Sequence, residues 1–285
     1  VIAEIGECFN GDLAVARQLI QVARDSGCDY AKFQTLDATK VSKDDPELDW
    51  FLRIALSEEQ IDTLIGYGEQ VGIPILFTPE NKDTAVWLHE HGLNAVKIAS
   101  SSLVDDSLLG YVNSRFQTVF LSTGMGSLDE IDCAVRYLGE VPQLYILHCI
   151  SEYPTGPLLE KRGLKAVAPE DVHLNMMNML MQMYPQYKVG YSDHTQGVLA
   201  PVAAVAAGAV VIEKHITMDR EMPVLNLHEG RKYLGTDHIL ALEPDELKEM
   251  VRQIREVEVM LGSWSWERSA GENVLVNFLR QRFQS

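Results

Sequence analysis

Residues 188–217 read KVGYSDHTQGVLAPVAAVAAGAVVIEKHIT, and this stretch carries one complete unit of the pattern that decides the fold. A short β-rich run, Lys188–Asp193, precedes a segment suited to a helix, and a second β-rich run, Val210–Thr217, follows it. A strand, a helix and another strand in this order form the repeating unit of a parallel sheet. The stretch therefore predicts an α/β protein.

The same alternation extends over most of the chain. Six earlier β-rich runs are each followed by a segment of helical period, at Val1–Gly6, Tyr30–Thr35, Ile75–Glu80, Ala95–Ser100, Thr118–Gly124 and Leu144–Ile150. Eight strand–helix repeats predict a (β/α)8 TIM barrel, which takes about 250 residues. An open doubly wound sheet is the alternative, but no G-x-G-x-x-G motif follows the first run, which disfavours a dinucleotide-binding version.

Three local signals place the starts of helices. Ser57 and Gln60 have the spacing of a capping box, and so do Ser127 and Glu130. Pro244 stands where a helix could begin, just before a long apolar stripe. These positions predict helices before the third and the sixth β-rich runs and after the last one.

Composition excludes several classes of protein. Of 285 residues, 46% are hydrophobic and 23% charged, which is typical of a globular domain. The 24 basic and 41 acidic residues give a net charge of −17, which argues against nucleic acid and anionic membranes as partners. No apolar stretch is long enough to span a membrane, and no leader is seen at the start.

The cysteines indicate a reducing compartment. None of the four, Cys8, Cys28, Cys133 and Cys149, belongs to a C-x-x-C motif, so neither a disulfide framework nor a zinc ribbon is predicted. We therefore expect the protein in the cytoplasm.

Polar residues recur at the ends of the β-rich runs, where a TIM barrel carries its chemistry. They include Glu4, Lys32, Gln34, Thr78, Lys97, Ser100, Ser122, His148, Ser192, His194, Glu213 and His215. Lysines and hydroxyl groups are suited to bind a phosphate or carboxylate. Two histidines ending the seventh and eighth runs could hold a catalytic divalent metal. The joint pattern predicts a site for an anionic ligand.

Each of these residues also has a purely structural interpretation. A lone lysine such as Lys97 more often faces solvent or pairs with a carboxylate. His148 could equally be a hydrogen-bonded core residue, and Cys149 a small buried hydrophobe. Glu213 and Lys214 could form an ion pair without a catalytic role. Only the combination of polar strand ends favours a functional site.

Nine motifs in sequence order carry a family resemblance. They are Ala3-Glu4-Ile5-Gly6, Lys32-Phe33-Gln34, Thr78-Pro79, Lys97-Ile98-Ala99-Ser100, Leu121-Ser122-Thr123-Gly124-Met125, Leu147-His148-Cys149, Tyr153-Pro154-Thr155, Gly190-Tyr191-Ser192-Asp193-His194-Thr195 and Ile212-Glu213-Lys214-His215. Together they resemble the sialic acid synthase family, from Ala3 to about Leu247. This family includes N-acetylneuraminate, legionaminate and pseudaminate synthases and proteins of spore-coat polysaccharide synthesis.

The resemblance implies a reaction and its cofactor. Phosphoenolpyruvate would condense with an N-acyl aldose, similar to N-acetylmannosamine, to give a nonulosonic 2-keto acid and phosphate. A divalent metal, Mn or Mg, would polarise the aldehyde oxygen as a Lewis acid. The resemblance also implies a homodimer.

The resemblance further implies roles for twelve residues. The metal ligands would be His194 and His215, and Glu4 would lie near the reacting centre. The residues that face the sugar or the metal-bound water would be Gln34, Tyr153 and Asp237. Phosphoenolpyruvate would lie against Lys32, Thr78, Lys97, Ser100, Ser122 and Ser192.

The sequence departs from the family pattern at several places. Ser102 stands where the family has a glutamate that is a candidate for proton transfer. Glu7-Cys8-Phe9-Asn10-Gly11 replaces the usual x-Asn-His-x-Gly. Many members also carry a C-terminal antifreeze-like domain that contributes an arginine to the sugar, and the tail after the barrel is too short to be that domain. We therefore expect a barrel over residues 1–262 and a tail over 263–285.

Two alternatives to an active synthase remain open at this point. The first is a barrel that binds phosphoenolpyruvate but has lost or altered its turnover, since Ser102 cannot supply a carboxylate. The second is a metal-dependent aldolase or lyase, which would not release phosphate from phosphoenolpyruvate.

Overall fold

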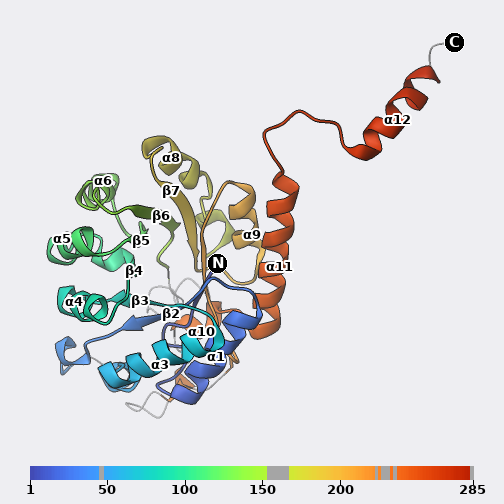
Figure 1. The fold of residues 1–285 in the computed structure, drawn as a ribbon. Coiled ribbons are helices and arrows are strands. Elements are labelled where there is room, and N and C mark those ends of the chain that lie inside the picture. The colour runs from blue at the N-terminus through green and yellow to red at the C-terminus, as the bar shows by residue number, and fades with distance from the viewer. Residues whose placement is uncertain (45–47, 153–166, 222–223, 226–231, 234–235, 283–285) are drawn as a thin grey trace.

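Eight parallel strands form a barrel with helices around its outside in the computed structural model, which describes residues 1–44, 48–152, 167–221, 224–225, 232–233 and 236–282 (Figure 1). The strands are β1 (Ile2–Glu4), β2 (Tyr30–Thr35), β3 (Ile75–Pro79), β4 (Ala95–Ile98), β5 (Thr118–Ser122), β6 (Gln143–Cys149), β7 (Lys188–Asp193) and β8 (Ile212–His215). Each overlaps one of the β-rich runs read from the sequence.

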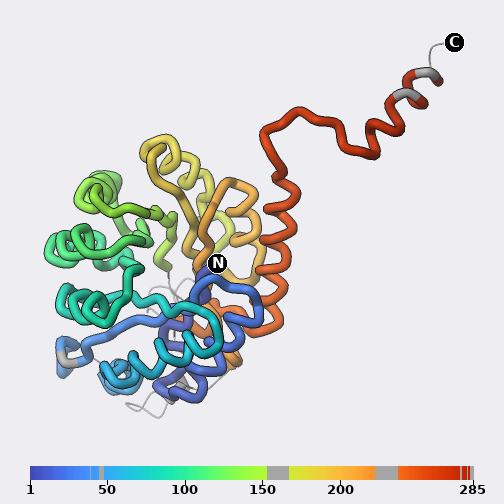
Figure 2. The backbone as a smooth tube through the Cα atoms, in the orientation of Figure 1, coloured from blue at the N-terminus to red at the C-terminus, as the bar shows by residue number. Residues whose placement is uncertain are grey.

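The order of the strands establishes the TIM barrel. Hydrogen-bonded neighbours run β3-β2-β1-β8-β7-β6-β5-β4, and every pairing is parallel. The two ends of this order, β3 and β4, lie against each other, so the sheet is nearly closed. Figure 2 follows the chain around the barrel from one strand to the next. The prediction of a TIM barrel is confirmed, and the open doubly wound alternative is wrong.

Helices connect successive strands on the outside of the barrel. They are α1 (Leu13–Asp25), α2 (Leu48–Ile54), α3 (Glu58–Val71), α4 (Lys82–Glu90), α5 (Asp106–Arg115), α6 (Leu128–Tyr137), α8 (Asn175–Met183), α9 (Leu199–Ala206), α10 (Thr236–Leu240) and α11 (Pro244–Leu261). Both expected capping boxes are present, at the starts of α3 and α6. Pro244 is the first residue of α11, so all three helix starts are confirmed.

The core has two parts. Most buried apolar side chains lie between the strands and the surrounding helices. A smaller cluster of Ile2, Leu76, Phe120, Leu147 and Val211 fills the barrel interior. This apolar interior supports the strand ends above it, where the buried residues become polar.

Alternation along β7 and β8 sends neighbouring side chains to opposite sides of the sheet. Ser192 and Glu213 are paired in register and bond to each other, whereas the next register pair is Asp193 and Lys214. Lys214 Nζ lies 2.5 Å from Asp193 Oδ2, and both side chains are completely buried. Asp193 also accepts a hydrogen bond from Tyr191 at 2.7 Å. This ion pair links β7, which is followed by His194, to β8, which ends at His215.

The segment between β8 and α10 contains a short element that sequence reasoning did not find. Two-residue strands β9 (Val224–Leu225) and β10 (Lys232–Tyr233) pair antiparallel. Residues 153–166, between β6 and α8, lie outside the described residues.

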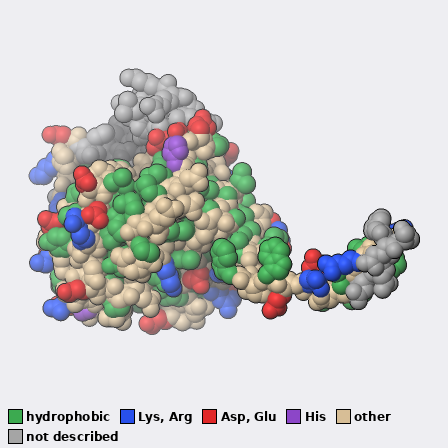
Figure 3. Space-filling model, turned by 90° about the horizontal axis from the view of Figure 1, so that it is seen from above, with side chains coloured by type: hydrophobic (Ala, Val, Ile, Leu, Met, Phe, Trp, Pro, Cys, Tyr) green, Lys and Arg blue, Asp and Glu red, His purple; other side chains and the backbone are tan. Residues whose placement is uncertain are grey.

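The C-terminal segment leaves the barrel. After α11 the chain extends outward and ends in α12 (Ala270–Gln281), which Figures 1 and 3 show projecting well away from the barrel. Trp264 and Trp266 in the connecting stretch are fully exposed. Apolar side chains of α12 are exposed as well, among them Leu275 and Phe278.

Two further expectations concern the chain as a whole. All four cysteines are free thiols, as the absence of a disulfide motif predicted. Among the described residues, no helix combines the length and apolar composition that crossing a bilayer requires.

Candidate active site

The polar strand ends surround one cavity of about 310 Å³. Ten of the twelve residues expected at the site line it: Glu4, Lys32, Gln34, Thr78, Lys97, Ser100, Ser122, Ser192, His194 and His215. They come from seven different strands or the turns that follow them, so only the closed barrel brings them together. The cavity therefore lies at the C-terminal ends of the strands, where TIM-barrel chemistry is located.

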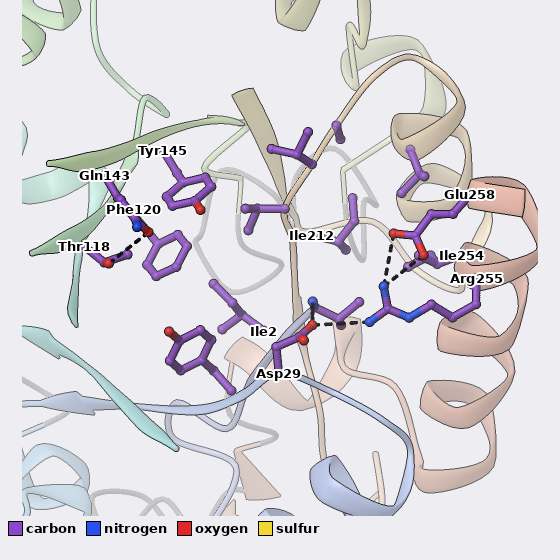
Figure 4. A pocket seen from close by; sticks show the side chains of 16 residues that line it. Ile2, Asp29, Thr118, Phe120, Gln143, Tyr145, Ile212, Ile254, Arg255 and Glu258 are labelled. Carbon is purple, nitrogen blue, oxygen red and sulfur yellow. Dashed lines mark hydrogen bonds and ion pairs between the residues drawn. The ribbon is translucent and has the colours of Figure 1, made fainter. Parts of the chain in front are cut away.

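A second cavity, at the opposite end of the barrel, differs in character. Figure 4 shows it lined by Phe120, Tyr145 and aliphatic side chains. Its charged groups pair at the rim, where Arg255 lies 3.3 Å from Asp29 and 3.0 Å from Glu258. These charged groups are paired with one another at its rim, whereas lysines, carboxylates and histidines converge at the strand ends, so the first cavity is the candidate active site.

Lys32 is buried on the floor of the site. Its ammonium group donates to Thr78 Oγ1 at 2.8 Å and forms an ion pair with Glu4. Burial lowers the pKa of Lys32, but the carboxylates of Glu213 and Glu4 raise it more, to a value above the usual one. Lys32 therefore stays cationic in the site.

Lys97 reaches the same floor from β4. Its Nζ lies 2.8 Å from Glu213 Oε1, which also accepts a hydrogen bond from Ser192 Oγ at 2.8 Å. Lys32 Nζ lies 3.8 Å from the other oxygen, Oε2. Burial raises the pKa of Glu213, but the two ammonium groups and the hydrogen bonds lower it far below its usual value. Glu213 is therefore a carboxylate between two cations.

Hydroxyl groups complete this part of the cavity. Ser122 Oγ is buried and has no hydrogen-bond partner among the described residues. Ser100 Oγ lies 2.9 Å from Ser151 Oγ, and both residues line the cavity. Because a buried hydroxyl without a partner is costly, Ser122 is suited to bind a polar ligand. Two lysines and these hydroxyls make a site for an anion.

Two histidines stand beside the anion site. The rings of His194 and His215 have centroids 5.4 Å apart, as the neighbouring strands β7 and β8 require. His194 Nδ1 lies 2.8 Å from the Ile150 carbonyl oxygen, so Nδ1 carries the proton and donates it to that oxygen. Nε2 then keeps its lone pair and can bind a metal. His215 Nδ1 lies 3.3 Å from Asp237 Oδ2. A second partner on each ring is typical of metal-binding histidines.

The donor set fits an open metal site. Within the described residues, no group of three or more His, Cys, Asp and Glu side chains is arranged to hold a metal. Two imidazoles alone would leave most coordination positions to substrate or water, which suits a catalytic divalent ion rather than a structural one. The two histidines are thus the residues that would hold the expected cofactor.

The surroundings of His194 shift its pKa in opposite directions. Burial lowers the pKa of His194, but the sulfur of Cys149 and the Ile150 carbonyl give a net increase. Cys149 Sγ lies 3.6 Å from His194 Nδ1 and lines the cavity. Burial raises the pKa of the Cys149 thiol, and His194 lowers it to below its usual value. A metal ion at Nε2 would compete with the second proton on this ring.

Glycine at position 6 leaves room for the carboxylates of Asp237 and Glu4. A Cβ on Gly6 would lie 2.5 Å from Asp237 Oδ2 and 3.0 Å from Glu4 Oε1, and φ is +49°. Gln34 Nε2 donates to Glu4 Oε1 at 2.9 Å, which fixes that carboxylate. Burial raises the pKa of Asp237, and His215 lowers it to a net value below the usual range. Asp237 is therefore an anion that orients His215.

The two remaining expected residues differ in their placement. Asp237, on α10, lies beside His215 and is buried, but it is not among the residues that line the cavity. Tyr153 lies outside the described residues. Ser102, which replaces the family glutamate, ends a short 3-10 helix at Ser100–Ser102 and does not line the cavity either.

Comparison with known proteins decides the family. The NeuB family matches residues 19–265, which is most of the chain. The chain belongs to the NeuB family. The N,N'-diacetyllegionaminic acid synthase of Campylobacter jejuni is 34% identical over 301 residues, covering 99% of this chain and 83% of that protein. The human N-acetylneuraminate-9-phosphate synthase is 32% identical over 280 residues, covering 92% and 71%.

Solved structures agree with this assignment. The N-acetylneuraminic acid synthetase of Leptospira borgpetersenii, in complex with citrate, matches with a TM-score of 0.83 at 27% identity, covering 100% of this NeuB-family chain and 92% of that one. The resemblance to the sialic acid synthase family is therefore confirmed, and so is the prediction of an enzyme of that type.

Sequence reasoning missed part of this NeuB-family site. Glu213 lines the cavity, although it was given no role there and an ion pair with Lys214 was its alternative interpretation. The two do not pair: Glu213 bonds Lys97 inside the barrel, and Lys214 bonds Asp193 on the other side of the sheet. Strand alternation was the available signal, because Glu213 shares a face with His215 two residues later. Cys149, Ser101, Met125 and Ser151 also line the cavity.

Proposed function

We propose that this NeuB-family enzyme condenses phosphoenolpyruvate with an N-acyl aldose to give a nonulosonic 2-keto acid and phosphate. The observation that carries this proposal is the convergence of Lys32, Lys97 and buried hydroxyls beside the pair His194 and His215. Such a site suits an anionic donor next to a metal-activated aldehyde.

The anion site suits the two charged ends of phosphoenolpyruvate. Lys32 and Lys97 enter the cavity from β2 and β4, and Ser122 and Ser192 line it as well. Ammonium and hydroxyl donors would bind the phosphate and carboxylate oxygens and hold the donor's C3 towards the aldehyde. The roles of these residues, and those of Thr78 and Ser100, stay predictions.

The histidines would hold Mn or Mg. When bound, this ion supplies Lewis-acid polarisation of the aldehyde oxygen. Asp237 holds the ring of His215 through Nδ1, and the Ile150 carbonyl holds His194 in the same way. Gln34 donates a hydrogen bond to Glu4, and this carboxylate is the group proposed to accept or deliver a proton. Gln34, Tyr153 and Asp237 are the residues proposed to face the sugar or the metal-bound water.

A phosphate-release assay tests the function. The purified protein is incubated with phosphoenolpyruvate, Mn and a panel of aldoses that includes N-acetylmannosamine, diacetamido 6-deoxy sugars and short aldehydes. We expect phosphate release that requires both the metal and one class of N-acyl aldose, with a 2-keto acid formed in equal amount. A keto acid formed without phosphate release would indicate an aldolase instead.

Binding without turnover is the second candidate, because Ser102 occupies the position of the family glutamate. It predicts that phosphoenolpyruvate raises the melting temperature while no sugar yields product. In that case Ser102→Glu is the variant that should restore phosphate release. No gain in that variant would contradict the explanation by Ser102.

We further propose that the enzyme is a cytoplasmic homodimer with residues 1–262 as the barrel and 263–285 as a tail. Four free cysteines favour a reducing compartment. An isolated helix as short as α12 is marginal in water, and its apolar side chains are exposed. We propose that a second copy of the chain covers these apolar side chains.

The substitution Phe278→Asp is expected to weaken the dimer at least about tenfold, because it places a charge on the apolar side of α12. Light scattering coupled to size-exclusion chromatography over a range of concentrations measures the change. Asn273→Asp adds the same charge on α12 without removing an apolar group and serves as the control. A wild-type chain that is monomeric at every concentration would show the homodimer proposal to be wrong.

A further inference from the structure

We infer that Glu213 is a fixed internal counter-ion of the anion site, which weakens the hold of Lys32 and Lys97 on phosphate and so allows the product to leave. This inference rests on the proposed function, because it concerns the phosphate that the reaction releases. It gives a role to a cavity residue that the reaction scheme above does not use.

The contacts of Glu213 show that it occupies the lysines. Its Oε1 lies 2.8 Å from Lys97 Nζ and 2.8 Å from Ser192 Oγ. Its Oε2 lies 3.8 Å from Lys32 Nζ and has no hydrogen bond among the described residues. The side chain is only 5% exposed. One carboxylate thus spans both cations from which an anion site would be built.

The charges on the floor of the site cancel. Lys32 and Lys97 contribute two positive charges, and their ion-pair partners Glu4 and Glu213 contribute two negative ones. A phosphate that enters must compete with Glu213 for Lys97, and the two anions repel each other at short range in a poorly screened site. A purely affinity-driven site would have no carboxylate there.

Glu213 cannot readily turn away from an incoming anion. Ser192 and Lys97 hold its Oε1, and β8 places its backbone between β1 and β7 in the barrel wall. Its negative charge is therefore present before and after the reaction. Phosphoenolpyruvate presents a carboxylate as well as a phosphate to the lysines and hydroxyls, and these additional contacts offset the repulsion. Free phosphate has only one such group. Phosphate therefore binds more weakly than phosphoenolpyruvate and is released.

The test is the affinity for inorganic phosphate, measured by isothermal titration of the full chain at constant pH and 0.15 M salt. Glu213→Gln keeps the shape and one acceptor oxygen, replaces the other oxygen by an amide donor and removes the charge. We expect it to bind phosphate at least about tenfold more tightly than the wild type. In turnover, KM for phosphoenolpyruvate and kcat should both fall, and phosphate should inhibit more strongly.

Two variants control for charge and for shape. Glu213→Asp keeps the charge and should bind phosphate within about threefold of the wild type. Glu256→Gln removes a charge from an exposed ion pair on α11 and should change nothing. Melting temperatures without phosphate show whether each variant is folded.

Two results would overturn the inference. If Glu213→Gln bound phosphate equally or more weakly, Glu213 would be orienting Lys97 and Ser192 rather than opposing the anion. If Glu213→Asp bound as tightly as Glu213→Gln, shape rather than charge would be the cause. Failure of the proposed function is distinguishable, because phosphate affinity is measured without sugar or turnover. An inactive wild type with a tighter Glu213→Gln variant would refute the reaction and leave the counter-ion in place.

Discussion

The substitution His215→Ala is expected to lower kcat/KM for synthesis by about 10³-fold or more. His215 is one of two imidazoles at the mouth of the cavity, and Asp237 orients its ring. Loss of the metal removes several kcal/mol of charge stabilisation at the aldehyde oxygen, and each 1.36 kcal/mol corresponds to a factor of ten in rate. Because the ring lies at a strand end, the fold should survive.

The measurement pairs activity with metal content. Steady-state rates are compared for wild type and His215→Ala, and bound Mn is measured by elemental analysis after dialysis. The chelator EDTA should inactivate the wild type and cause no further loss in the variant. His91→Ala, at an exposed histidine after α4, is the matched control and should keep full activity. A His215→Ala variant that retains both Mn and turnover would refute the metal assignment.

The second large effect concerns stability. Lys214→Met is expected to lower the free energy of unfolding by about 3–5 kcal/mol, because it leaves Asp193 as an unpaired charge in the core. Lys214 is fully buried, and its ammonium lies 2.5 Å from Asp193 Oδ2. Burial lowers the pKa of Lys214 and Asp193 opposes that shift, so the pair depends on both partners. The melting temperature should fall by roughly 10 °C.

Thermal and urea unfolding monitored by circular dichroism measure this loss. The double variant Asp193→Asn/Lys214→Met should recover much of it, because no buried charge is left without a partner. Arg252→Met removes one side of an exposed ion pair and should cost less than about 1 kcal/mol. Equal stability of Lys214→Met and the wild type would show that Asp193 is compensated by Tyr191 and Thr195 alone.

The barrel could be predicted because its signals are local. Each β-rich run is short and is followed by a helical stripe or a capping box, as at Ser57 and Ser127. The position of the site followed from the same pattern, since parallel strands in a barrel deliver their last residues to one end. Ten expected residues line a single cavity for this reason.

What could not be predicted depends on contacts between distant strands. Glu213 and Lys214 are adjacent in the chain, which suggested one ion pair, but the pleat directs them to different partners 116 and 21 residues away. Asp237 reaches His215 from α10, an element that no local signal in the sequence placed beside β8.

The two ends of the barrel differ in function, and this difference affects how the protein can evolve. At one end, charged strand termini form the reacting cavity, and almost any exchange there alters chemistry. At the other, Phe120 and Tyr145 line a separate hollow whose charged groups pair at the rim (Figure 4). Substitutions that fill this hollow can raise thermal tolerance while the catalytic end is left unchanged. Adaptation to temperature and adaptation to a new sugar can thus proceed independently in this fold.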